Sequence, residues 1–236
     1  SRGLGDVYKR QAMANIMRAT HLDEAIFASL CRESDMYHVL QRCAILVSRM
    51  ALTMPPPMFH DMVRATASWP DLCRRLISTS ATLSLARSRK LVALGLAHML
   101  RHASAQDKGL LSAVPDMIGM WTEVVGEVVE DEAGSADRYE RELSPTRALE
   151  IGEDGIPFLD EFGLIEAAPT PSSARTDAVR SRDPSFNVPL RAYVADTLNA
   201  VLQNGSYKTQ LQSLLATIDP LVLDTLQRGL SERPVA

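Results

Sequence analysis

Apolar residues recur every three to four positions through most of the chain, which is the spacing of one face of an amphipathic α-helix. One such stripe, between residues 36 and 50, comprises Met36, Val39, Leu40, Cys43, Leu46, Val47 and Met50. Prolines at positions 55–57 predict the end of this helix, because proline lacks a backbone N–H and clashes with the preceding turn. No segment alternates as a strand would, so the pattern predicts an all-α fold of about eight or nine helices.

Three further prolines predict helix starts. Pro70 suits the first turn of a helix, and Asp219 followed by Pro220 has the order of an N-cap and the first helical residue. Pro115 lies inside an apolar run, so we expect a kink or a helix start there. Residues 91–97 read LVALGLA and are apolar on every side, which predicts a helix buried on more than one face.

Moderate helices joined by short turns favour antiparallel helix pairs. Pairs that stack in sequence form an α-solenoid, and a repeat of about 40–47 residues is typical of HEAT-type pairs. The alternative is a compact irregular helical domain, which periodicity alone does not distinguish from a solenoid.

The acidic residues are concentrated in one segment. The net charge of the chain is −4, yet residues 127–166 alone contain 13 acidic and 3 basic residues. Helical periodicity fails after Glu132, where glycines and a run of Pro, Ser and Thr follow, so we expect a long acidic disordered loop there. Residues 1–11, SRGLGDVYKRQ, look like translated sequencing adapter and are set aside. The expected organisation is a non-native leader at 1–11, HEAT-type helical repeats at 12–132, an acidic flexible loop at 133–186 and C-terminal helical repeats at 187–236.

The composition argues against several classes of protein. No basic stripe dominates, so a nucleic-acid partner is not expected. No apolar run is long enough to span a bilayer, and we expect no membrane partner. The three cysteines form no paired framework, which indicates reduced thiols in the cytoplasm or nucleus: Cys31, Cys43 and Cys73.

No residue pattern points to an active site, so we expect a protein that is not an enzyme and has no cofactor. His98 and His102 have the spacing of a zinc-binding helix, but the segment between them lacks a glutamate and a third ligand. Packing or surface histidines are the favoured interpretation, and no metal is expected. The other histidines lie beside no known nucleophile motif: His21, His38 and His60.

Acidic side chains at the end of the preceding helix and within the loop are the candidate contacts for a basic protein partner: Glu130, Asp131, Glu132, Asp154, Asp160 and Glu161. The competing interpretation of the first three is a solvated helix face. The loop also carries apolar residues among its acids, in DGIPFLDEFGLIE at residues 154–166. That stretch fits either a short recognition motif or a segment that docks onto the chain's own helices.

Three stretches resemble the ends of large nuclear transport receptors. They are SRKLVALGLAHML at 88–100, DPSFNVPLRAYVADTLNAVL at 183–202 and ATIDPLVLDTLQRGL at 216–230. The arrangement is similar to the C-terminus of the importin-eleven branch of the importin-β superfamily, and the similarity covers most of the chain after residue 35.

The resemblance implies a C-terminal part of a HEAT solenoid that carries protein cargo through nuclear pores and shuttles between nucleus and cytoplasm. The six acidic residues named above would then be cargo contacts, because cargo with basic patches would meet the acidic loop favourably. The resemblance also implies Ran-GTP binding, mainly through N-terminal repeats that precede this part, and FG nucleoporins bound in shallow apolar grooves between helices. The alternative is a HEAT-repeat scaffold for a protein complex unrelated to transport, which would not require FG binding.

Overall fold

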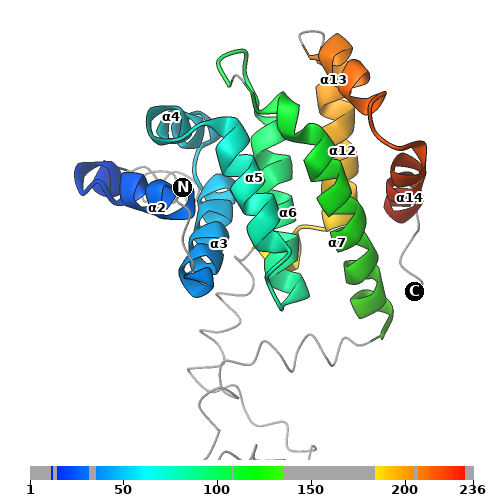
Figure 1. Ribbon diagram of the computed structural model, residues 1–236, viewed down its shortest axis with the longest axis horizontal. Coiled ribbons are helices and arrows are strands. Elements are labelled where there is room, and N and C mark those ends of the chain that lie inside the picture. The colour runs from blue at the N-terminus through cyan, green and yellow to red at the C-terminus, as the bar shows by residue number, and fades with distance from the viewer. Residues whose placement is uncertain are drawn as a thin grey trace, which may run out of the picture.

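A computed structural model describes residues 12, 15–31, 36–107, 109–134, 184–204 and 207–231 of the chain (Figure 1). Within these ranges the regular elements are helices and there is no strand, which confirms the all-α prediction. The elements are α2 (Leu22–Cys31), α3 (Tyr37–Thr53), α4 (Pro56–Thr66), α5 (Trp69–Ser80), α6 (Ala86–Arg101), the 3-10 helix η1 (Leu111–Ala113), α7 (Val114–Gly134), α11 (Pro184–Asn187), α12 (Leu190–Gln203), α13 (Lys208–Leu215) and α14 (Pro220–Ser231).

The longer helices form two layers. In one layer α6 packs between α3 and α12, and in the other α7 packs between α5 and α14. Each helix of the first layer also contacts one of the second, which gives the pairs α3/α5, α6/α7 and α12/α14. A further helical element connects the two members of each pair: α4, η1 and α13 respectively. This threefold recurrence of helix, connector and helix confirms the predicted α-solenoid.

The helix starts follow the proline rules read from the sequence. Helix α7 begins at Val114, which places Pro115 in its first turn. At the start of α5 the Ser68 hydroxyl accepts a hydrogen bond from the Asp71 backbone N–H at 3.3 Å, and Pro70 lies in the first turn. At α14 the Asp219 carboxylate accepts from the Leu221 backbone N–H at 2.8 Å. These three predicted starts are therefore confirmed.

Helix α6 is the centre of the hydrophobic core. Every residue from Lys90 to Ala97 is buried, which confirms the prediction for residues 91–97. Gly95 permits its close contact with α3, because a Cβ atom at that position would lie 2.9 Å from Ser48 Cβ. On the other side the Trp121 indole N–H of α7 donates to the Ala93 carbonyl at 3.1 Å. The buried face of α6 thus joins neighbouring pairs.

The predicted acidic loop and leader lie largely outside the described residues. Helix α7 continues to Gly134, and helix begins again at Pro184 in α11. Residues 135–183 between them, and residues 1–11, are outside the described ranges. Ser185 of α11 is buried and its hydroxyl contacts Arg87 Nε of α6 at 2.8 Å, so the chain returns to the core after this segment.

Candidate functional site

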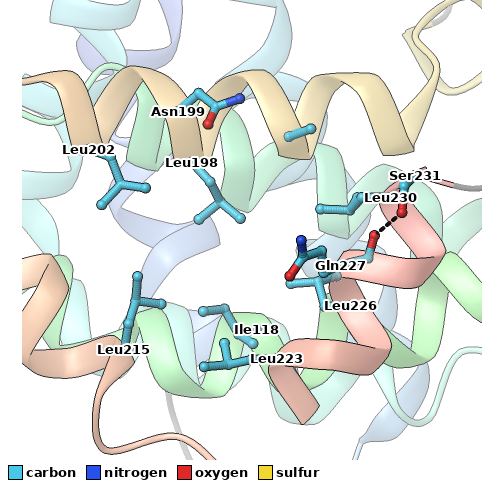
Figure 2. Close-up of a pocket in the computed structure, with 11 residues that line it drawn as sticks. Ile118, Leu198, Asn199, Leu202, Leu215, Leu223, Leu226, Gln227, Leu230 and Ser231 are labelled. Carbon is cyan, nitrogen blue, oxygen red and sulfur yellow. Dashed lines mark hydrogen bonds between the residues drawn. The ribbon is translucent and has the colours of Figure 1, made fainter. Parts of the chain in front are cut away.

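An apolar groove lies where the third helix pair meets α7 (Figure 2). It has a volume of about 600 Å³. Helices α7, α12, α13 and α14 contribute its lining residues: Ile118, Ala195, Leu198, Asn199, Leu202, Leu215, Leu223, Leu226, Gln227, Leu230 and Ser231. We refer to this set as the α12–α14 groove.

Helical spacing explains why the leucines face one another across the groove. Leu198 and Leu202 are four residues apart on α12, and residues at that spacing share a helix face. On α14 the same face carries Leu223, Leu226 and Leu230. Leu226 is only 4% exposed and forms part of the floor, whereas the other four of these leucines are half-buried. The groove therefore leaves apolar wall surface open to water.

The floor depends on a close contact between α14 and α7. A Cβ atom at Gly229 would lie 2.9 Å from Val125 Cγ1, so the absence of a side chain there lets the two helices approach. Ile118 of α7, which is fully buried, completes the floor beside Leu226. Gly229 and Gly95 thus both allow neighbouring helices of the solenoid to pack closely.

The groove offers hydrophobic contact with a few polar groups at its mouth. Asn199, Gln227 and Ser231 are exposed, and the Ser231 hydroxyl donates to the backbone carbonyl of Gln227. The lining set contains no residue with a titratable side chain. Such a surface suits an apolar or aromatic side chain from a partner, with neutral hydrogen-bonding groups to orient the backbone beside it.

A second cluster of polar groups lies at the loop between α6 and η1. The buried carboxylate of Asp107 accepts hydrogen bonds from His60 Nδ1 at 2.9 Å, an Arg64 guanidinium nitrogen at 2.8 Å, Trp69 Nε1 at 3.2 Å and the Ser104 backbone N–H at 2.8 Å. Burial alone would raise the pKa of Asp107, but the hydrogen bonds from His60 and Ser104 outweigh it and lower the pKa. The cluster anchors this loop to α4 and α5.

His98 of α6 and His102, the C-cap residue of that helix, form a ring pair, and His98 contacts α12 of the third helix pair. The rings of His98 and His102 are 4.5 Å apart, and His98 Nδ1 contacts the Tyr193 hydroxyl of α12 at 2.5 Å. Burial, followed by the neighbouring His102, lowers the pKa of His98 to about 4. Among the residues that the structure describes, no group of three or more His, Cys, Asp or Glu side chains is arranged to hold a metal ion.

The predicted cargo-contact residues lie outside the part of the chain whose side chains the structure describes. Glu130, Asp131 and Glu132 lie towards the end of α7, and their side chains are outside the described set. Asp154, Asp160 and Glu161 fall in the segment 135–183, also outside it. Their role stays a prediction.

Sequence reasoning missed the α12–α14 groove. Leucines that line it, such as Leu198 and Leu223, belong to stripes with the spacing of any core-facing helix. Which of these leucines remain accessible depends on how α12 packs against α14. No local pattern in the sequence encodes this packing.

The chain matches the model of a known protein family. The family described as "Importin-11-like, TPR repeats" matches residues 4–231, which is nearly the whole chain. That description names TPR repeats where the sequence suggested HEAT-type repeats, and both are stacked antiparallel helix pairs. No curated protein and no solved structure shows a detectable match. No helix in the described ranges has the length and apolar character needed to cross a bilayer.

Proposed function

Because this chain belongs to the importin-11-like family, we propose that it is the C-terminal part of a nuclear transport receptor that binds protein cargo. The family suggests nuclear transport in general terms, with shuttling between nucleus and cytoplasm. We extend this to passage through the nuclear pore under Ran-GTP control, by binding rather than catalysis. The observation that carries the proposal is the family match over residues 4–231.

The α12–α14 groove supports a role in pore passage. FG nucleoporins present phenylalanine side chains, and the groove offers half-buried leucine walls over the buried floor residue Leu226. Burying one such side chain contributes about 1.5–3 kcal/mol, which is weak for a single site. Weak sites used many times allow fast exchange and still hold a receptor in the pore by multivalency.

Cargo and Ran binding are assigned to other parts of the receptor surface. We propose that acidic residues at the end of α7 and in the segment after it attract cargo with basic patches, which raises the association rate and favours such partners. Deleting residues 133–182 is then expected to lower the affinity for basic cargo. Unchanged affinity for every basic cargo tested would contradict this role. From the family resemblance we propose that the main Ran-GTP contact is made by N-terminal repeats.

Binding to FG repeats tests the proposed function. The purified chain is passed over an immobilised FG-repeat segment and over a matched segment with each Phe replaced by Ser. Leu223→Asp in the groove is expected to lower FG affinity about tenfold, because it removes an apolar contact worth about 1.5 kcal/mol or more. Leu221→Asp is the control, since Leu221 lies on the same helix but is 66% exposed and outside the groove.

Two results separate transport from other functions. Binding to the FG segment alone, with loss in the groove variant and not in the control, supports the transport receptor. Equal retention on the Phe and Ser segments would overturn the assignment of the groove and favour a helical-repeat scaffold unrelated to transport.

A further inference from the structure

We propose that a segment of this same chain, residues 156–165, docks in the α12–α14 groove when no partner is bound. Several leucine walls of the groove are half-buried, so water contacts apolar surface there unless another apolar group covers it. The inference rests on the groove described above. It does not depend on FG repeats being the partner.

The sequence of this segment fits an apolar groove. Residues 156–165 read IPFLDEFGLI and form the densest apolar run between the end of α7 and the start of α11. Phe158, Phe162 and Ile165 are spaced at i, i+4 and i+7, which is the spacing of anchor residues in helix-in-groove ligands. The two acids between the phenylalanines would remain in water at the open side of such a contact.

The connections on either side are long enough. About twenty residues separate the run from Gly134 on one side and from Pro184 on the other. At about 3.3 Å per residue each connection reaches some 60 Å. Helix α7, with 21 residues, is only about 32 Å long. Both connections therefore reach any point on α7, whose residue Ile118 lies in the groove floor.

The connecting segment is tethered to two helices that line the groove. The segment leaves from α7 and returns through α11 into α12, and both α7 and α12 line the groove. A ligand tethered in this way has an effective concentration in the millimolar range. A contact with a dissociation constant below about 1 mM would then be occupied most of the time, and an external peptide would have to displace it.

Methyl NMR on the full chain tests the proposal without any partner. Aromatic rings shift the signals of methyl groups against which they lie, so the leucine methyls of the groove report on Phe158 and Phe162. Substituting both residues (F158S, F162S) is expected to move the Leu202 and Leu223 methyl signals and leave those of Leu221 in place. The matched control changes Leu149 and Ile151 of the same segment to Ser and is expected to move none of them.

The reverse experiment uses the five phenylalanines of the chain as fluorine labels. Leu202→Asp is expected to move the signals of Phe158 and Phe162 to the position of free fluorophenylalanine, while those of the buried Phe27 and Phe59 stay in place. If the signals of Phe27 and Phe59 also move, the variant is misfolded. The methyl NMR experiment then tests the proposal by itself. Groove methyls that are unchanged in the F158S, F162S variant would overturn the proposal, whether or not the chain binds FG repeats.

Discussion

Replacing Asp107 by Asn is expected to lower the free energy of unfolding by about 3 kcal/mol at neutral pH. The Asp107 side chain is fully buried and accepts from the His60, Trp69 and Ser104 donors at 2.8–3.2 Å. An amide in its place presents an NH₂ group to one or more of these donors and removes the charge. Breaking a buried ionic network of this kind costs about 3–5 kcal/mol.

We expect a loss at the lower end of this range of about 3–5 kcal/mol, because the Arg64 side chain can adjust after the change. The Arg64 side chain is 27% exposed and also contacts Asp61, so it keeps an ion pair and some hydration after the change. The donors of His60 and Trp69 have no such alternative, since both residues are nearly completely buried. Each buried donor left without an acceptor costs about 1–3 kcal/mol, and the losses are not additive.

The pH dependence provides the second part of this prediction. The pKa of Asp107 in the folded chain lies below its ordinary value of 3.8, so the folded state releases this proton more readily than the unfolded state. Its contribution is therefore complete above pH 3.8 and is lost as the pH falls through the folded pKa. The stability difference between wild type and variant should shrink as the pH falls below about 4.

Urea unfolding followed by tryptophan fluorescence measures both effects, because Trp69 itself contacts Asp107. Asp224→Asn serves as the control, since Asp224 is a surface residue that pairs with Arg228 four residues on. A variant within about 0.5 kcal/mol of wild type, or a difference that does not change down to pH 3, would refute the assignment of Asp107 as the anchor of this loop.

Three further predictions concern packing and protonation. Gly95→Ala should destabilise the chain by about 1–3 kcal/mol, because the new Cβ would meet Ser48 at 2.9 Å; urea unfolding that shows no loss would mean that α3 and α6 separate freely. Gly109→Ala should cost about 1–2 kcal/mol or more, since Gly109 has a φ of +88° and its Cβ would lie 2.7 Å from Pro70 Cγ; an equal melting temperature would contradict this. His98 should titrate in NMR near pH 4, below an exposed histidine, and a midpoint near 6.5 would show that its ring is hydrated in solution.

The sequence was sufficient to predict features that depend on residues close to each other along the chain. Pro115 and Pro220 marked helix starts because proline acts within one turn, and residues 91–97 showed their burial by having no polar face. The family resemblance, carried by three short stretches, agrees with the match over residues 4–231. These features are local, so the sequence contains them directly.

Contacts between distant segments could not be read in the same way. Asp107 meets His60 across 47 residues, and Tyr193 meets His98 across 95 residues. Neither partner carries a local signal of the other, because each is an ordinary polar residue in its own helix or loop. The groove could not be predicted for the same reason, since Leu198 and Leu223 face each other only after α12 and α14 have packed.

The connection between α7 and α11 is long, yet its length adds little to the free-energy cost of packing α12 against α6. For a chain segment joined at both ends, the entropic cost of closure grows as about (3/2)RT ln n, so each doubling of length costs only about 0.6 kcal/mol. Lengthening a connection from about five residues to about fifty therefore costs about 2 kcal/mol. The buried contacts of α12 and α14 with the first two pairs can offset a cost of that size. The length of this connection is thus a trait that can change in evolution by tens of residues without loss of the third helix pair.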